Sequence, residues 1–223
     1  IDDNHPSGFN YFTREQLHSY VSELHSIGYR VNFHAIGDQA VRDALDAIEG
    51  IDDSPEAIAD RRHRTTHTYL VHPDDVSRFA DIGVVADFQQ SDDAVATDYH
   101  DYLADFIGDR AYDLIPTAQL LDTDATVTLS SDWDAGPLPP LGTIERALTR
   151  DANAVTDLET AIAMHTIDAA YALGHDDSTG SIEVGKYADY VILDQNLFDL
   201  EPDRIDETKI LYTVVGGTVV HRR

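Results

Sequence analysis

Residues 30–38 read Arg-Val-Asn-Phe-His-Ala-Ile-Gly-Asp, and this stretch decides the class of fold. Its first half is typical of a buried or half-buried strand, and Gly37 allows a tight exit into a helix predicted over 38–49. Asp38 can act as the N-cap of that helix by accepting backbone N–H groups. His34 then lies at the carboxyl end of its strand, the end at which β/α barrels carry out their chemistry.

The same alternation of strand and helix continues to about residue 175. Thr13 and Gln16 predict a capping box for the first helix, and Gly28 ends it. Further strands are predicted at 62–67, 84–88 and 125–129, and helices at 13–26, 73–81, 98–106, 113–123, 143–150 and 158–172. Four strands that alternate with helices predict an α/β fold of parallel βα units joined by right-handed crossovers.

Residues 176–223 differ in character, because no periodic helix separates their strands. Short strands are predicted at 180–185, 188–193, 209–215 and 218–221. Gly216 and Gly217 suit a hairpin turn between the last two. We therefore expect two domains, an α/β domain over 1–175 and part of a small β domain over 176–223.

Four βα units are too few to close a β/α barrel, which normally needs eight. An open half would leave two exposed parallel edges. We therefore expect either that more chain lies upstream of residue 1 or that two copies cover one another as a homodimer. The chain begins with Ile1 rather than methionine, which favours a piece of a longer protein. An ordinary open α/β sheet is the structural alternative.

The composition is that of a folded but strongly acidic protein. With 223 residues and 42% hydrophobic content, the chain can bury one sizeable core, or a core and a small annex. Against 15 lysine and arginine residues stand 42 aspartate and glutamate residues, for a net charge of −27. This excess is typical of a halophilic proteome, because molar salt screens the self-repulsion. No basic stripe is present to neutralise phosphates, which argues against a nucleic acid as partner.

Cysteine is absent, which excludes disulfides, thiolate nucleophiles and cysteine-based zinc sites. Any metal must be held by histidine, aspartate, glutamate or a modified lysine. No apolar run approaches the roughly 20 residues of a membrane helix, and the first residues lack a signal-peptide pattern. We therefore expect no membrane contact and a cytoplasmic location.

Three polar residues follow predicted strands and could share one site. His34 ends the first strand, His67 ends the second, and Asp132 follows the fourth. In a parallel barrel all strand carboxyl ends lie on one face, so these side chains would converge. Two neutral imidazoles and a carboxylate suit Zn²⁺ or a similar divalent ion, with a position left for water. Asp132 could take the proton of this water and pass it to a leaving nitrogen.

Each of these residues also has an ordinary structural interpretation. A strand-end histidine is commonly hydrogen-bonded within the fold, and an aspartate after a strand commonly belongs to a turn. Asp38 is more readily an N-cap than a ligand, and Trp133 is equally a pocket wall or a core residue. The placement of all three candidates at strand ends favours the joint site.

Five segments together resemble the amidohydrolase superfamily, and within it amidohydrolase family 3, the group of N-substituted formamide deformylase-like proteins. The resemblance covers nearly all 223 residues. The segments are 31–38 (VNFHAIGD), His67 with 70–75 (LVHPDD), 131–133 (SDW), 179–189 (TGSIEVGKYAD) and 214–220 (VVGGTVV). The fourth segment is the most specific, since similar proteins carry Gly-Ser-Ile-Glu-x-Gly-Lys-x-Ala-Asp where the chain enters the small β domain.

The resemblance implies a metal-dependent hydrolase of carbon–nitrogen bonds other than peptide bonds. Its substrate would be a small amide or formamide-like molecule, and its cofactor one or two divalent ions, with zinc as the first choice. Residues 1–175 would supply about strands 5 to 8 of a distorted (β/α)8 TIM barrel, and 176–223 the C-terminal part of a composite β-sandwich. His34 and His67 match two histidine ligands of the family, and Asp132 matches the strand-8 aspartate that shuttles the proton.

The chain departs from the family pattern at several positions. The His-x-His pair of the first barrel strand has no counterpart, and a bridging lysine is not identifiable. Residues 66–68 read Thr-His-Thr where relatives carry Glu-His-Ala. Residues 89–92 read Gln-Gln-Ser-Asp where relatives carry Gln-Pro-x-His, and Asp134 replaces a proline.

The loop after the third strand is expected to line the substrate pocket, so Gln89 and Gln90 join Asp38 and Trp133 as pocket candidates. Its altered chemistry leaves the identity of the substrate open. It also raises a second hypothesis, a non-catalytic binding or regulatory protein on the same scaffold, since some relatives have been labelled as regulators of exoenzyme production.

Overall fold

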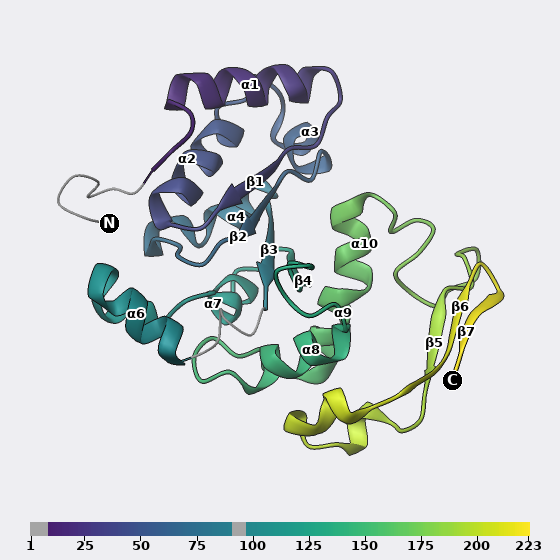
Figure 1. The fold of residues 1–223 in the computed structure, drawn as a ribbon. Helices are drawn as coiled ribbons and strands as arrows, with labels where there is room; N and C mark the ends of the chain where they lie inside the picture. Colours follow the sequence, from purple (N-terminus) through teal and green to yellow (C-terminus); the bar gives the residue numbers. More distant parts are fainter. Residues whose placement is uncertain (1–8, 91–96) are drawn as a thin grey trace.

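The computed structural model describes residues 9–90 and 97–223. A parallel sheet of four strands forms its centre, in the order β1 (Asn32–Ala35), β2 (Arg64–His67), β3 (Val85–Gln89) and β4 (Val127–Ser130) (Figure 1). Each strand pairs in parallel with the next one along the chain, which confirms the prediction of consecutive βα units. All four carboxyl ends therefore lie at the same edge of the sheet.

The sheet has an apolar and a polar face, because side chains alternate along each strand. Phe33, Phe88 and Leu129 are buried on the apolar face, within the main core. Polar side chains cross the other face in register, from His34 on β1 through Thr66 and Asp87 to Thr128 on β4. This polar row leads to the carboxyl edge of the sheet, where the predicted site residues lie.

Helices before, between and after the strands cover the sheet. They are α1 (Arg14–Ser26), α2 (Asp38–Glu49), α3 (Pro55–Asp60), α4 (Arg78–Ile82), α6 (Thr97–Ile107), α7 (Thr117–Leu121), α8 (Pro140–Thr149), α9 (Leu158–His165) and α10 (Ile167–Leu173). The capping box of Thr13 and Gln16 at the start of α1 is confirmed. In α2, Val41, Leu45 and Ile48 recur at helical spacing and are buried. No helix in the described ranges has the length and apolar character needed to cross a membrane.

Several helix predictions were wrong in extent. Residues 73–81 split into the 3₁₀ turn η1 (Pro73–Asp75) and α4, and 113–123 shrink to α7, which starts only after Pro116. Residues 158–172 break into α9 and α10 at Thr166, whose φ of −121° and ψ of −88° are not helical. Helix α3 was missed, although Ser54 as cap and Pro55 at the first position are typical start signals.

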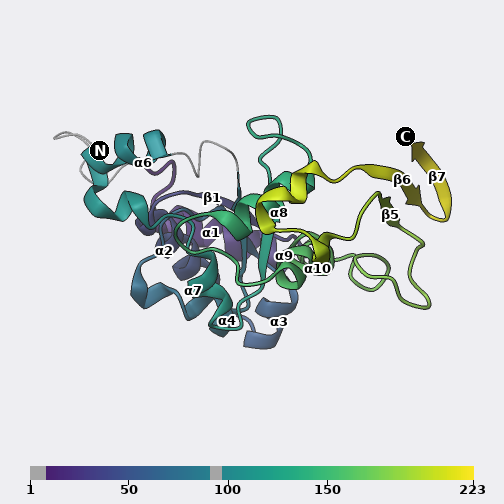
Figure 2. The same ribbon diagram turned by 90° about the horizontal axis from the view of Figure 1, so that it is seen from below.

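The chain from about residue 176 forms a second, antiparallel sheet of β5 (Tyr190–Leu193), β6 (Ile210–Val215) and β7 (Thr218–Arg222). The predicted hairpin at Gly216 and Gly217 is confirmed. The predicted strand over 180–185 was wrong, because this segment forms turns in which Ser181 and Lys186 bond to one another. Figure 2 shows this sheet at the opposite end of the molecule from α6.

Two short 3₁₀ helices, η3 (Leu197–Asp199) and η4 (Pro202–Glu207), connect β5 to β6. The η4 helix packs against α8, where the backbone N–H of Asp206 donates to the carboxylate of Glu145 at 2.9 Å. A further 3₁₀ helix, η2 (Gly108–Tyr112), follows α6. The contact between η4 and α8 joins the antiparallel sheet region to the α/β part of the chain.

Candidate active site at the carboxyl ends of the parallel strands

His34 and His67 lie side by side on neighbouring strands. His34 is the third residue of β1 and His67 is the last residue of β2, with Ala35 opposite His67 in the register. Their ring centroids are 4.3 Å apart, and the rings meet edge to face at 61°. The parallel register thus brings together two histidines that are far apart in the sequence.

The surroundings of His67 favour its neutral form. The residue is 8% exposed, and burial lowers its pKa. The nearby His34 lowers this pKa further, whereas Asp132 and Asp87 act in the opposite direction. Its Nδ1 atom is buried and has no hydrogen-bond partner within 9–90 and 97–223. A neutral imidazole with an unpaired nitrogen has the chemistry of a metal ligand, because a metal binds the deprotonated nitrogen.

Asp132 lies close enough to His67 to influence its pKa, but the three predicted residues do not form a closed ligand shell. Asp132 follows β4 in a turn with a φ of 56°, and Trp133 beside it is 69% exposed rather than part of a core. Among the described residues, no group of three or more histidine, cysteine, aspartate or glutamate side chains is arranged to hold a metal ion. The structure therefore offers a histidine pair with a neighbouring carboxylate.

Asp38 is the first residue of α2, and the prediction that it is the N-cap was wrong by one position. Gly37 takes that position with an extended backbone and offers no side chain to cap the helix. The Asp38 carboxylate accepts the N–H of Gln39 at 3.0 Å and pairs with Nη1 of Arg110 at 2.6 Å. Asp38 thus links α2 to η2 beside the histidine pair.

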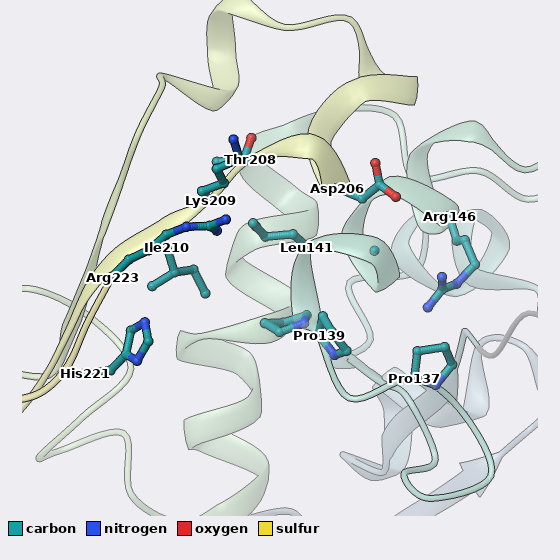
Figure 3. Close-up of a pocket in the computed structure, with 12 residues that line it drawn as sticks. Pro137, Pro139, Leu141, Arg146, Asp206, Thr208, Lys209, Ile210, His221 and Arg223 are labelled. Carbon is teal, nitrogen blue, oxygen red and sulfur yellow. The ribbon is translucent and has the colours of Figure 1, made fainter.

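A cavity of about 1120 Å³ opens beside β1, and His34 and Asp38 are among its lining residues. Its walls are mostly apolar and aromatic and come from α1, β1, α2 and α6, with Tyr20 and Tyr102 among them. A second cavity of about 750 Å³ lies between the start of α8 and strands β6 and β7, as Figure 3 shows. The second cavity contains none of the predicted site residues, so we place the candidate site at the first.

Gln89 and Gln90, predicted as pocket candidates, do not line the cavity beside His34. They are 4% and 0% exposed, respectively. The Gln90 carbonyl accepts Nε of Arg146 at 2.6 Å, so α8 covers the end of β3. Both side chains therefore lie within the fold. Residues 91–92, the remainder of the altered loop, lie outside the described residues.

Sequence reasoning missed Asp87, which lies at the centre of the polar face. Its carboxylate accepts Oγ1 of Thr66 at 3.0 Å, Oγ1 of Thr128 at 2.9 Å and Nε2 of Gln89 at 3.1 Å. A carboxylate inside the apolar run 84–88 was the signal that could have revealed it. Burial also lowers the pKa of His165 to about 4, and Asp87 opposes that shift.

Parallel βα units with polar residues at the strand carboxyl ends define an α/β protein with a site where such folds place their chemistry. The model of the amidohydrolase family matches residues 2–221, and the chain belongs to this family. This confirms the family expected from the sequence motifs.

Known proteins from several organisms are similar to the chain. It is 26% identical to N-substituted formamide deformylase of Arthrobacter pascens, over 97% of the chain and 41% of the relative. It is 32% identical to the protein LONG AFTER FAR-RED 3 of Arabidopsis thaliana, over 97% of the chain and 38% of the relative. The chain thus spans about two fifths of the length of these relatives.

Solved structures share the fold. A metal-dependent hydrolase from Pyrococcus horikoshii superposes with a TM-score of 0.70 and 24% identity, over 96% of the chain and 41% of that protein. An adenosine deaminase from Xanthomonas campestris with bound zinc has a TM-score of 0.65 and 17% identity, over 96% of the chain and 49% of that protein. These likenesses show that the chain shares the fold of these proteins.

Proposed function

We propose that the protein is a metal-dependent hydrolase that cleaves a carbon–nitrogen bond, other than a peptide bond, in a small amide or formamide-like substrate. The observation that carries the proposal is the edge-to-face pair of His34 and His67 at 4.3 Å, with the buried Nδ1 of His67 unpaired among the described residues. The similarity to a formamide deformylase and to a zinc-containing deaminase supports this reaction class.

The residues present fit part of a metal site. His34 and His67 would hold the ion, since zinc accepts neutral imidazoles and its sites commonly need three or four protein ligands. When bound, a divalent ion supplies Lewis acidity toward the amide and toward the water that attacks it. The further ligands would come from outside the described residues, because the described ones contain no larger ligand cluster.

The roles of the chain's own residues follow from their placement. The carboxylate of Asp132 takes the proton of the attacking water and delivers it to the leaving nitrogen, as a general base and then a general acid. Asp132 raises the pKa of His67, which supports the placement of this carboxylate near the histidine pair. The neutral state of His67, favoured by burial, keeps a nitrogen available for the ion rather than for a proton.

We also propose that the four strands are strands 5 to 8 of a (β/α)8 barrel, with residues 1–175 in the barrel and 176–223 in a composite β-sandwich. Among the described residues β1 lies at the end of the strand order and pairs only with β2, so its outer edge can take up a further strand. The two-fifths coverage of the relatives supports a longer protein. A homodimer of this chain is the alternative way to cover that edge.

Metal analysis of the full-length protein in high salt tests the histidine pair. Wild-type protein and an exposed-histidine control, His221→Ala, should carry a divalent ion, whereas His34→Ala and His67→Ala should lose most of it. Equal metal content in all four proteins would contradict the assignment. Hydrolysis of a panel of N-substituted formamides, abolished by Asp132→Asn with metal content retained, would support the role of Asp132.

A binding or regulatory protein without turnover is the second candidate function. It is favoured by the absence of a closed ligand cluster among the described residues and by the similarity to LONG AFTER FAR-RED 3, whose name states no reaction. A metal-loaded full-length protein that turns over any amide or formamide would exclude it. A protein that binds such molecules but never hydrolyses them would favour it.

A further inference from the structure

The side chain of Gln89 connects the carboxyl ends of three strands. Its Oε1 accepts the backbone N–H of His67 on β2 at 2.6 Å. Its Nε2 lies within hydrogen-bonding distance of Oγ1 of Thr66, at 2.5 Å, and of Oγ of Ser130 on β4, at 3.0 Å. With 4% exposure, this carboxamide is a buried cross-link at the edge of the sheet that holds the histidine pair.

The backbone that Gln89 holds has an unusual conformation. His67 has a φ of 68° and Thr68 a φ of 51°, so two consecutive residues with side chains occupy the left-handed region. This region is costly for residues other than glycine, and most of all for β-branched ones. The surrounding bonds must therefore hold it, and besides Gln89 they include the bond from the N–H of Thr68 to the carbonyl of Ala35 at 2.8 Å. The His67 ring, at the first of these two residues, lies against the His34 ring.

Asp87 determines which way the Gln89 amide faces. A carboxylate only accepts hydrogen bonds, so the group 3.1 Å from its Oδ2 must be the NH₂ of Gln89. The carbonyl oxygen is then left for the His67 N–H. Hydroxyl groups of Thr66 and Thr128 donate to the same carboxylate and fix it in turn. Asp87 is thus the anchor of the network.

We propose that Gln89 is a positioning residue for His67, oriented by Asp87, and that it sets the pose of the His67 imidazole against His34. This inference deepens the proposed function, because the pose matters for catalysis only if the pair binds a metal. The proposal assigns a role to Asp87 and Gln89, neither of which lines the cavity beside β1. Groups that orient metal ligands in this way commonly change metal affinity by about ten- to a hundredfold when removed.

The test uses full-length protein labelled with ¹⁵N. In Gln89→Glu, a second carboxylate would face Asp87, so the side chain should turn away from it. We expect the exchange of the His67 amide proton to become at least tenfold faster and the nuclear Overhauser contacts between the His34 and His67 rings to weaken. The double variant D87N/Q89E should restore both, because an Asn amide can donate to the new carboxylate.

Gln195→Glu is the matched control, since Gln195 also donates to a threonine, Oγ1 of Thr208 at 3.0 Å, but lies far from β3 in the sequence and in the other sheet region. It should leave the His67 signals unchanged. Unchanged His67 exchange and ring contacts in Gln89→Glu, or no recovery in D87N/Q89E, would overturn the proposal.

Zinc titration of the same variants provides a second readout. We expect the zinc affinity to fall in Gln89→Glu and to recover in D87N/Q89E. A change in exchange with wild-type zinc affinity would overturn the positioning role. The exchange and ring-contact measurements require neither metal nor turnover. A protein that binds no zinc at all would therefore count against the proposed function, while these measurements still decide the role of Gln89.

Discussion

His25 and His63 share a buried hydrogen bond of 3.0 Å, between Nδ1 of His25 and Nε2 of His63. Nε2 of His25 lies 3.1 Å from the carboxylate of Asp53, and the N–H of Val31 donates to Nδ1 of His63 at 3.1 Å. Because Val31 donates to Nδ1, His63 accommodates only the neutral form with its proton on Nε2. The pair ties α1 to the start of β1.

This chain of hydrogen bonds predicts that the protein loses stability in acid. Burial, together with the nearby His25, Arg61 and Arg30, lowers the pKa of His63 to about 4. The unfolded chain, with an ordinary value near 6.5, then binds more protons than the folded one between these values. Stability should therefore fall as the pH drops from about 6.5 to 4, by on the order of 3 kcal/mol from this group.

Urea unfolding across that pH range, for wild type and His63→Gln, measures the effect. Glutamine can still accept the Val31 N–H but does not titrate, so the variant should show a flatter dependence on pH. Parallel curves for the two proteins would contradict the role of His63.

Arg62 anchors the segment after α10 to the start of β2. Its Nη1 donates to the carbonyl of Tyr171 at 2.8 Å and to Asp176 at 2.5 Å, and its guanidinium lies 4.0 Å from the centre of the Tyr171 ring. Arg62→Ala should lower the free energy of unfolding by about 2 kcal/mol, because the hydrogen bonds of its charged guanidinium to Tyr171 and Asp176 are lost. Arg204→Ala, which removes a surface pair with Glu207, is the control for denaturant unfolding. Equal effects of the two variants would contradict the prediction.

Gly83 ends α4 with a φ of 78°, and a Cβ there would lie 2.6 Å from Cβ of Ala59. Gly83→Ala should therefore combine left-handed strain with a clash against α3, at a cost of about 2 to 4 kcal/mol. Gly108 has a φ of 64°, and a Cβ added there would meet no atom within 4 Å. The variant Gly108→Ala therefore measures the backbone strain alone. Thermal unfolding should thus show a clearly larger loss for Gly83→Ala than for Gly108→Ala, and the reverse order would contradict the packing of α3 on Gly83.

The net charge of −27 predicts that salt stabilises the fold. At low ionic strength the acidic groups repel one another over about 10 Å or more, whereas at molar salt the range falls to about 3 Å. The melting temperature should therefore rise from about 0.1 to about 2 M KCl at constant pH, because the added salt shortens the range of this repulsion. A melting temperature independent of salt would contradict this view of the charge.

Much of the local structure could be predicted because its signals lie close together in the sequence. The helix over 38–49 was predicted with its observed ends, and the Gly216–Gly217 turn follows from two adjacent residues. Errors arose where several signals compete, as at Thr166, where one periodic apolar pattern continues across two helices. The candidate histidines were found because both end strands, which is a local property.

By itself, the sequence determined the alternation of strands and helices, the family and the positions of His34 and His67 at strand ends. Only the tertiary structure decided that these rings meet, that Gln89 and Gln90 are buried rather than at the cavity, and that Asp87 anchors a network across three strands. The physical reason is strand register. Which side chains share a face and a row depends on contacts between distant segments, and no local signal in residues 30–38 specifies those contacts.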